Sequence, residues 1–377
     1  MILGNAHIIG EEGRKNIVIE NGKIKAVTAQ QLDSLSLITL PEESICFPGL
    51  INSHDHLDFN LFPQLGNRIY KNYKEWGDDI YQNNIDEINA VVAIPEDIRT
   101  QWGIYKNLLC GVTTVVNHGR KINANNDLIT IFQDCYSLHS LIYEKSWKLK
   151  LNNPFSNKKP FVIHTGEGTD EWSHREIDKL ISANMLKKKL IAIHGVAMDP
   201  AQAKAFEALI WCPDSNYFLL GATADIKNVK EKTTIIFGTD STLSARWSIW
   251  NHLRLARKEN VLTDQELFDS VSSTAAKVWN TSNGTIANGR IADIVVARKK
   301  DMTGDMDSFY SLNPENILLV ISKGRVRLFD ESLSDQLKAD NFNPVTINGT
   351  VKYVWGDLPG LMASVKAHYS NAAFPFL

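Results

Sequence analysis

Two histidines at the end of an apolar run are the first residues in this chain whose types and spacing could do chemistry. The run ICFPGLI, from Ile45 to Ile51, is followed by Asn-Ser and then by His54, Asp55 and His56. In a strand the side chains alternate between faces, so the two histidines point to one side and the aspartate to the other. Two neutral imidazoles side by side make half of a site for zinc or a similar cation. Because H-x-H pairs also occur among core histidines, a metal site needs further ligands.

Later apolar segments end in residues that can bind metal or carry a proton. These segments are GVTTVVNH, ending at His118; PFVIH, ending at His164, with Glu167 three residues on; LIAIH, ending at His194; and TTIIFGTD, ending at Asp240. In a parallel barrel the carboxyl ends of the strands share one face, so residues distant in sequence can meet there. Any one of them is more often a core or loop residue, but their recurrence at successive strand ends favours one shared site.

The elements that must position these residues alternate strands with helices. Helix starts are indicated by Asp199-Pro200, an N-cap followed by an N1 proline, and by two capping-box patterns, Ser173-x-x-Glu176 and Thr263-x-x-Glu266. Repeated strand-then-helix units predict a parallel α/β fold, and the length favours a TIM-type (β/α)8 barrel. We assign this barrel to residues 48–283.

The two ends of the chain have a different pattern, with short alternating strands around turns. The turn signals are Asn21-Gly22 near the N-terminus, and Asn288-Gly289 and Lys323-Gly324 in the C-terminal part. We predict one small β-sandwich domain built from residues 1–47 and 284–377, the latter including a C-terminal tail. Two separate β modules are the alternative, but neither piece alone buries much apolar surface.

Composition excludes several classes of protein. The chain has 377 residues, 44% hydrophobic and 22% charged, and its net charge of −3 gives no electrostatic reason to expect nucleic acid. No apolar run reaches the roughly 18 residues of a membrane span, and the N-terminus MILGNAHIIG does not resemble a secretory signal. The four cysteines are scattered, which is typical of a reducing compartment. We therefore expect a cytoplasmic protein, with a homodimer as the default assembly.

Taken in order, the segments PGLINSHDH, HTGEG, IAIHG, WCPDSN and GTDS resemble the amidohydrolase superfamily, in the branch that contains cytosine deaminase, guanine deaminase and the triazine and adenosine-like deaminases. The resemblance implies one divalent metal, zinc foremost and iron or manganese as alternatives. Its ligands would be His54, His56, His164 and Asp240. Glu167 would shuttle a proton from the attacking water to the leaving nitrogen, with a turn or capping carboxylate as the alternative.

The same resemblance implies roles for three further residues. His194 would polarise the attacked centre, hold the nucleophile or bind substrate, and its alternative is a structural hydrogen bond. Asp240 would also orient the nucleophile. Ser215 and Asn216 would hydrogen-bond the substrate, although an asparagine in a loop is often a turn residue. His118 and His139 have no assigned role.

Two features bear on the metal count and on the substrate. Binuclear members of the superfamily bridge their metals with a carboxylated lysine; here Lys145 and Lys148 do not end a clear apolar strand, so a second metal is not expected. The loop after His56, LDFNLFPQLGNRIYKNYKEWGDDIY, is rich in aromatic residues. It either walls a pocket for a flat ring or packs on itself.

Three functions follow from these residues. The first is a hydrolase that attacks a C–N bond with a metal-activated water, deaminating a nitrogen heterocycle. The second is hydrolysis of a cyclic amide or displacement of another ring leaving group. The third is a non-catalytic scaffold barrel, which predicts loss of ligands, whereas every expected ligand is present in this chain.

Overall fold

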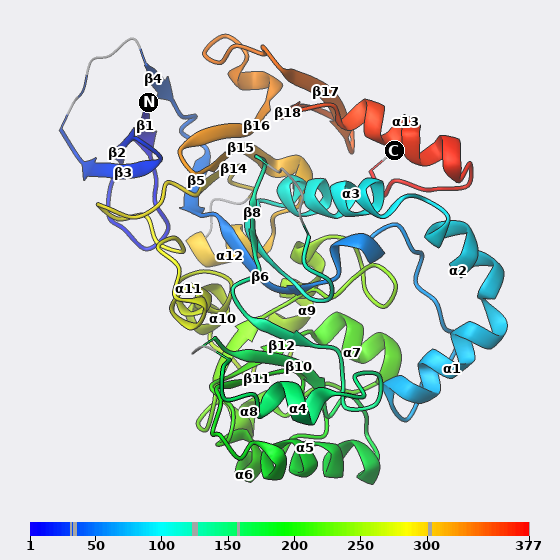
Figure 1. The fold of residues 1–377 in the computed structure, drawn as a ribbon. Coiled ribbons are helices and arrows are strands. Elements are labelled where there is room, and N and C mark those ends of the chain that lie inside the picture. The colour runs from blue at the N-terminus through cyan, green and yellow to red at the C-terminus, as the bar shows by residue number, and fades with distance from the viewer. Residues whose placement is uncertain (31, 33–35, 123–126, 157–158, 301–303, 377) are drawn as a thin grey trace.

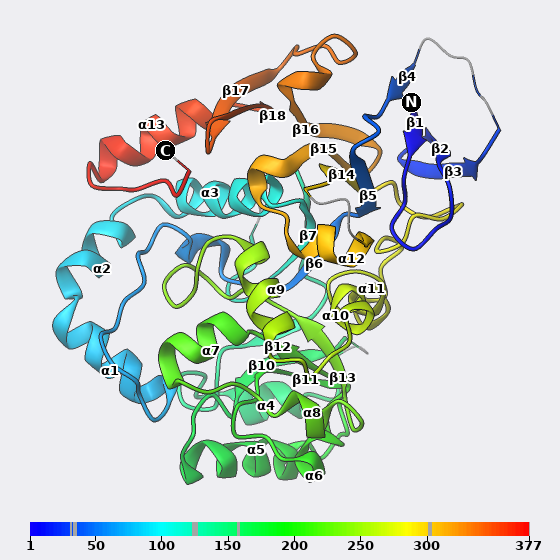
Figure 2. The same cartoon turned by 180° about the vertical axis from the view of Figure 1, so that it is seen from behind.

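The computed structural model describes residues 1–30, 32, 36–122, 127–156, 159–300 and 304–376. Parallel strands and helices occupy its middle, and antiparallel strands from both chain ends lie against one side (Figure 1). Figure 2 shows the same arrangement from behind, with both termini on the side of the antiparallel strands. Within the described residues, no helix combines the length and the hydropathy that crossing a bilayer requires.

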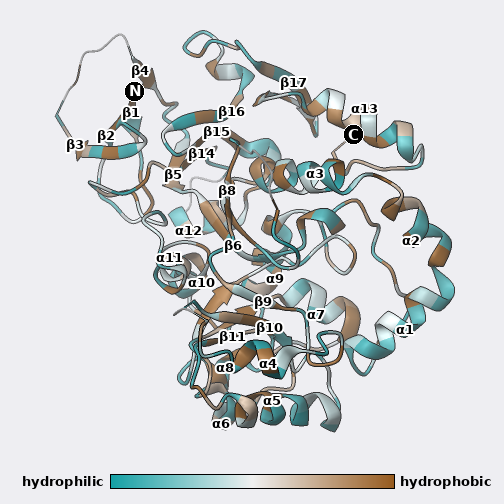
Figure 3. Cartoon of the chain, viewed as in Figure 1, coloured by the Kyte–Doolittle hydropathy of each residue, from teal (hydrophilic) through white to brown (hydrophobic). Residues whose placement is uncertain are grey.

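The central strands form two parallel sheets, in the orders β6-β7-β8 and β13-β12-β11-β10-β9. Their bounds are β6 (Leu50–Asp55), β7 (Val112–Asn117), β8 (Thr130–Phe132), β9 (Tyr136–Leu138), β10 (Phe161–Thr165), β11 (Leu190–His194), β12 (Ala208–Trp211) and β13 (Thr234–Phe237). Most of these strands are buried along their whole length and rich in Val and Ile, as expected of parallel strands covered on both faces (Figure 3). The predicted parallel α/β fold is confirmed.

The two parallel sheets meet at two places. At one, the backbone N–H groups of Thr239 and Asp240, just past β13, each donate to the carbonyl of His54 in β6 at 3.0 Å. At the other, β8 ends at Phe132 and β9 begins at Tyr136. Neighbouring parallel strands need a crossover of roughly a dozen residues, so β8 and β9 cannot pair with each other. The segment instead passes from one sheet to the other, and the described residues do not form a continuous closed barrel ladder.

Helices connect and cover these strands. They are α1 (Tyr73–Asn83), α2 (Ile85–Val92), α3 (Glu96–Leu109), α4 (Trp147–Leu151), α5 (Glu171–Ala183), α6 (Pro200–Ala203), α7 (Pro213–Leu220), α8 (Ile226–Val229), α9 (Ile249–Lys258), α10 (Asp264–Ser270) and α11 (Ser273–Trp279), with a short 3-10 turn η1 (Leu57–Phe59) after β6. Helices α1 and α2 stand at the edge of the molecule, away from the central strands (Figure 1).

The observed N-termini of the helices can be compared with the N-caps predicted from the sequence. Asp199 caps α6 and Thr263 caps α10, both with complete capping boxes. The box at Ser173-x-x-Glu176 is wrong, because α5 begins earlier: Asp170 is its N-cap and accepts from the Ser173 N–H at 2.9 Å. The Glu176 side chain is consequently free to bind elsewhere.

The chain ends form a four-stranded sheet, β3-β2-β1-β4, and a six-stranded sheet, β17-β18-β16-β15-β14-β5. The bounds are β1 (Ile2–Ala6), β2 (Lys15–Glu20), β3 (Lys23–Thr28), β4 (Leu37–Thr39), β5 (Ser44–Pro48), β14 (Ile294–Arg298), β15 (Ile317–Ser322), β16 (Arg325–Asp330), β17 (Phe342–Ile347) and β18 (Thr350–Trp355), with 3-10 turns η2 (Pro314–Asn316) and η3 (Glu331–Leu333) and helices α12 (Asp305–Tyr310) and α13 (Leu358–His368).

The predicted hairpins at Asn21-Gly22 and Lys323-Gly324 are confirmed, with positive φ at all four residues. Gly289 also turns, with φ 81°, but only an isolated bridge, Lys23 to Ile291, lies near it. Strand β5 from the N-terminal part pairs antiparallel with β14, so both ends of the chain contribute to one sheet. A single apolar cluster runs through both terminal sheets, from Leu3 and Ile17 to Val296 and Phe329.

Candidate metal and catalytic site

Four side chains from three strand ends converge on one point. His54 and His56 come from the end of β6, His164 from β10, and Asp240 from just past β13. The Nε2 atom of His164 lies 3.3 Å from Nε2 of His54 and 3.4 Å from Nε2 of His56. The Asp240 Oδ1 lies 3.6 Å from His54 Nε2 and 3.8 Å from His56 Nε2. Ligands about 2.0–2.1 Å from a tetrahedral metal lie about 3.4 Å apart, so these four separations are close to the size that one divalent cation requires. The ligand atoms of two triads that share His54, namely His54, His56 and Asp240, and His54, His164 and His194, lie within 4.8 Å of one another.

The protonation states of these groups also fit a cation. Burial, with the neighbouring His54 adding to it, lowers the pKa of His56 to about 3. Burial, with the His118 ring next in weight, holds the pKa of His164 well below its usual value. Burial opposes ionisation of Asp240, but the hydrogen bond and charge of His54 outweigh it and hold the pKa of that carboxyl well below its usual value. Neutral imidazoles and an ionised carboxylate are the forms that bind metal.

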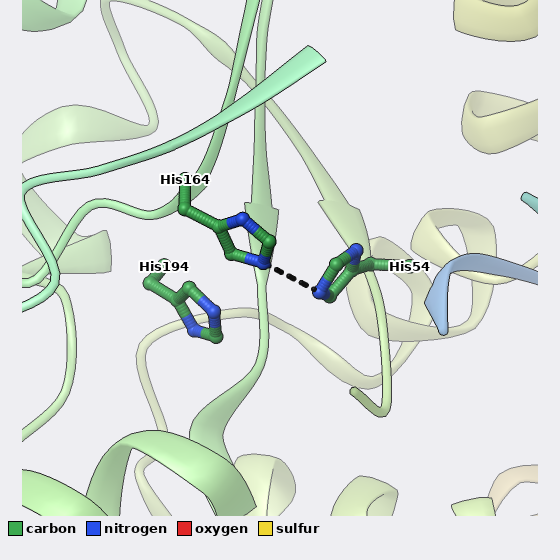
Figure 4. A group of neighbouring side chains, drawn as sticks. All are labelled: His54, His164 and His194. Atoms are coloured by element: carbon green, nitrogen blue, oxygen red, sulfur yellow. Dashed lines mark hydrogen bonds between the residues drawn. The ribbon is translucent and has the colours of Figure 1, made fainter. Parts of the chain in front are cut away.

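Neighbouring groups orient two of the four side chains. The Nδ1–H of His164 donates to the backbone carbonyl of His139 at 2.7 Å, which leaves Nε2 free to bind a metal. Figure 4 shows this nitrogen turned toward His54. Ser215 and Ser244 donate to the Asp240 Oδ2 at 2.8 and 2.6 Å, so Oδ1 is left to face the histidines. Asp240 has φ 59°, an uncommon conformation for a residue with a side chain, and such positions cluster at functional sites.

Glu167 and His194 form a second pair next to the four. The turn at Gly166, with φ 63°, carries Glu167 past the end of β10, and its Oε1 lies 3.5 Å from His194 Nε2. The Nδ1–H of His194 donates to Asn216 Oδ1 at 2.8 Å, so Nε2 is the free nitrogen. Figure 4 shows His194 beside His54 and His164. Burial, then the charge of Asp240, raises the pKa of Glu167 well above its ordinary value, which suits a group that takes up and returns a proton.

A cavity of about 480 Å³ opens over these groups. His56, His164, Glu167, His194 and Asp240 line it, and so do aromatic residues of the segment after His56, namely Phe59, Phe62, Tyr73, Trp76 and Tyr81. Of the two predictions for that segment, the pocket wall therefore holds in the structure. The volume is that of a typical small-molecule site.

Ser215 and Asn216 lie behind this cavity, at the start of α7. Both are fully buried, and their side chains contact Asp240 and His194. The cavity is lined by other residues. From the sequence we expected Ser215 and Asn216 near the site, with the substrate as their hydrogen-bond partner. The structure gives them protein partners instead. A sequence pattern cannot show this difference, because it does not reveal which way the start of a helix faces.

A buried polar network lies on the opposite face of β6. Asp55 points away from the histidines, as alternation predicts, and its Oδ2 is 3.1 Å from Lys106 Nζ on α3. Asn60 and Asn107 donate to the same carboxylate at 2.7 and 2.8 Å. Asn52 donates to Thr239 Oγ1 at 2.8 Å and accepts from its N–H at 3.1 Å, which connects β6 to the residue before Asp240. Sequence analysis missed this network, since its members are isolated polar residues in apolar segments.

His118 and His139 also lie at the site. The ring centroids of His118 and His164 are 4.4 Å apart, and those of His139 and His164 are 5.3 Å apart. The Nδ1 of His118 is 3.1 Å from Ser137 Oγ, and its buried Nε2 has no hydrogen-bond partner among the described residues. Their strand-end positions were the signal that could have placed them here.

Residues 155–327 match the model of the amidohydrolase family. Part of this chain is therefore similar to the amidohydrolase family. This match begins before β10 and ends in β16, so it contains His164, Glu167, His194 and Asp240. The resemblance inferred from sequence motifs is confirmed.

Two curated relatives match part of this chain. Both are 5-methylthioadenosine/S-adenosylhomocysteine deaminases: that of Pyrococcus abyssi is 26% identical over 156 residues, and that of Pyrococcus horikoshii is 29% identical over 160 residues. The matches cover 36% and 37% of this chain. They span 37% and 38% of the relatives' own lengths.

Solved structures match over almost the whole chain. An adenosine deaminase from Xanthomonas campestris with bound zinc has a TM-score of 0.73, with 13% identity and 98% of both chains covered. Atrazine chlorohydrolase from Arthrobacter aurescens TC1, complexed with zinc, has a TM-score of 0.68, with 17% identity and 97% and 99% covered. The central strands with their helices, together with the terminal sheets, therefore share their overall fold with these two structures.

Proposed function

We propose that this protein is a metal-dependent hydrolase that deaminates a nitrogen heterocycle by attack of a metal-activated water on a ring carbon. The observation that carries this proposal is the meeting of three imidazoles and one carboxylate, at tetrahedral spacing, next to the Glu167–His194 pair on the floor of a cavity. Hydrolysis of a cyclic amide is the less favoured alternative. Displacement of another ring leaving group is supported by the fold shared with a chlorohydrolase.

His54, His56, His164 and Asp240 would hold one divalent metal, with zinc as the first choice and iron or manganese as alternatives. When bound, the metal polarises a water and, in the case of zinc, lowers its pKa to about 7. The shared fold with two zinc-containing structures supports zinc. Ser215 and Ser244 would keep Asp240 Oδ1 turned toward the histidines.

Glu167 would accept the proton of the attacking water at Oε1 and return it to the leaving nitrogen, which departs as ammonia. His194, with Nδ1–H held by Asn216, presents Nε2 to the same space and would orient the nucleophile or the attacked centre. We assign Ser215 and Asn216 to holding Asp240 and His194, in place of direct substrate contacts. The aromatic wall would exclude water and hold a flat ring.

We also propose that the two parallel sheets are parts of one (β/α)8 barrel over residues 48–283, with a small β-sandwich from 1–47 and 284–377. The hydrogen bonds from Thr239 and Asp240 to β6, and the passage of the chain from β8 to β9, support the barrel. The apolar cluster shared by both chain ends supports the sandwich. From the sequence we further infer a cytoplasmic enzyme that acts on a small molecule, assembled as a homodimer.

The deciding experiment couples metal analysis to a screen for ammonia release. The purified protein is stripped with a chelator, reloaded with zinc, iron or manganese, and assayed on purines, pyrimidines, pterins and triazines. We expect about one metal ion per chain and ammonia release that depends on it. The His56→Ala and Asp240→Asn variants should lose both metal and activity. A protein that takes up no metal under any condition would refute the proposal.

A further inference from the structure

The cavity over the metal cluster extends well beyond the reacting groups. Its outer part lies between the segment after β6, helices α1 and α2, and helix α7, where Figures 1 and 2 show α1 next to α7. The walls there are formed mainly by apolar and aromatic side chains, including Phe59, Trp76, Ile80, Ile88, Val92 and Leu219. A flat ring on the floor leaves this outer part for whatever the ring carries.

The cavity lining carries acidic side chains but no basic lysine or arginine among the described residues. The ionisable groups are four histidines at the floor and wall, the carboxylates of Glu167 and Asp240, Asp78 in the outer part, and the phenols of Tyr73, Tyr81 and Tyr143. Asp78 forms an ion pair with Lys74 on the same helix, and Lys74 is not part of the lining. An anionic substituent would thus meet mainly apolar walls, the hydroxyls of Tyr81 and Tyr143 and a carboxylate, and no basic side chain among the described lining residues.

Physical chemistry makes this lining selective. Moving a phosphate or a carboxylate out of water is costly unless a cation or several hydrogen-bond donors receive it. An alkyl or alkylthio group gains from the same walls, roughly in proportion to the apolar area it removes from water. The proposed metal would not offset this cost in the outer part, because the residues that would hold it lie at the cavity floor, where the ring would react.

We propose that the substrate is a nitrogen heterocycle whose substituent is uncharged and apolar, seated in the outer cavity between α1, α2 and α7, and that heterocycles with anionic substituents are rejected. This inference rests on the proposed function, because it assumes that the ring reacts on the cavity floor. It narrows the substrate class by the charge of the tail, which the chemistry of the metal site leaves open.

The test uses adenosine derivatives that share one ring and differ only at the 5′ position. These are 5′-methylthioadenosine, with a neutral tail, and adenosine 5′-monophosphate, with an anionic tail. We expect kcat/KM for the methylthio compound to exceed that for the phosphate by at least about 100-fold. If a ring other than adenine gives the highest ammonia release, the same comparison uses its alkyl and carboxyalkyl derivatives of equal length.

Substitutions at Val92 test where the selectivity arises. Val92 lines the outer cavity at the end of α2 and is 51% exposed, so the fold tolerates a polar side chain there. Val92→Lys supplies a cation, and we expect the preference for the neutral tail over the anionic tail to fall at least about fivefold. Val92→Gln, similar in length and polarity but uncharged, should leave that preference within about twofold of the wild type.

Failure of this inference differs from failure of the proposed function. Equal kcat/KM for neutral and anionic tails would overturn the inference while the deamination stands. If no ring releases ammonia, the inference is tested instead by measuring equilibrium binding of the same compounds to the zinc-loaded protein. Tighter binding of the neutral tail by the stated margin supports the inference, and equal or undetectable binding of both tails overturns it.

Discussion

Glu167 is a carboxyl group whose environment suits proton transfer more than metal binding. Its Oε1 faces His194 Nε2, and it belongs to neither of the two residue triads that could hold a metal ion. A carboxyl group in this position can hold a proton near neutral pH and give it up within one reaction cycle. Asp240 is equally buried, but His54 holds it ionised. The pKa values of the two acidic residues of one site are therefore shifted in opposite directions.

The Glu167→Gln substitution tests this assignment. Glutamine has nearly the same shape but cannot take up a proton, so we expect turnover to fall at least about 100-fold. Bound metal should stay at the wild-type level, because Glu167 is not one of the proposed ligands. Both quantities are measured on the same preparation, by metal analysis and by ammonia release. Near-full turnover in this variant would refute the shuttle role.

Glu176 is the second carboxyl group with an unusual environment. It is buried behind the Gly166 turn, where Tyr73 donates to its Oε1 at 2.9 Å and the Gly166 N–H to its Oε2 at 3.2 Å. Burial raises the pKa of Glu176 to about 7, and these hydrogen bonds offset only part of the rise. The group therefore keeps its proton in the folded state at pH values where the unfolded chain has lost it.

This pKa predicts how stability depends on pH. Because the folded-state pKa is raised, the contribution of Glu176 is fully present below pH 4.5, its ordinary value, and is lost as pH rises to about 7. A shift of this size corresponds to about 3 kcal/mol. The Glu176→Gln variant does not titrate, so its free energy of unfolding relative to wild type should rise by up to that amount between pH 4.5 and pH 8. Denaturant titrations at both pH values check this, and an unchanged difference would contradict it.

At the scale of elements, the position of strand β6 depends on helix α3. The helix approaches closely because residue 103 is glycine: a Cβ there would lie 2.1 Å from the Leu57 carbonyl oxygen. This close approach brings Lys106 and Asn107 to the face of β6 that carries Asp55. The histidine face and the Asp55 face belong to the same strand, so a polar network on one side helps to fix the positions of His54 and His56 on the other.

The Lys106→Met substitution tests how much this network contributes. It leaves the Asp55 carboxylate buried without its cation, and we expect the free energy of unfolding to fall by about 3–5 kcal/mol. The double variant Lys106→Met/Asp55→Asn removes both charges and should recover most of that loss. Urea titrations of the wild type, both single variants and the double variant measure the coupling. A cost below about 1 kcal/mol for the single variant would show that the ion pair is dispensable.

At the scale of the whole molecule, the terminal sheets and the central strands share one core. Phe47 of β5 contacts both Trp250 of α9 and Phe309 of α12, with ring centroids 6.1 and 5.1 Å apart. Trp102 of α3 likewise packs on Phe374, near the C-terminus, at 4.8 Å. The contacts of Phe47 with Trp250 and of Trp102 with Phe374 cross the domain boundaries proposed from the sequence.

The shared core predicts that residues 48–283 do not fold independently. Expressed alone, this segment loses Phe47, Phe309 and Phe374 and exposes the apolar surfaces that they cover. We expect it to unfold without a cooperative transition or to aggregate, whereas the full chain unfolds cooperatively. Circular dichroism during heating compares the two, and a cooperative, metal-binding 48–283 segment would show that the barrel is an autonomous domain.

Residue patterns alone determined much of the fold and of the candidate site. Apolar runs that end in His54, His164, His194 and Asp240 indicated parallel strands and one shared face, because strand direction places their carboxyl ends together. Turn residues with positive φ, as at Asn21-Gly22, marked the hairpins for a local steric reason. Such features depend on a few neighbouring residues, and they are readable from the sequence.

Only the tertiary structure decided what depends on packing between distant segments. It placed Ser215 and Asn216 against Asp240 and His194, moved the start of α5 to Asp170, and brought Lys106 to Asp55. It also placed α1 and α2 along the cavity, whose lining lacks a basic side chain among the described residues. No local pattern encodes which faces meet, since that choice follows from burying the whole apolar surface at once.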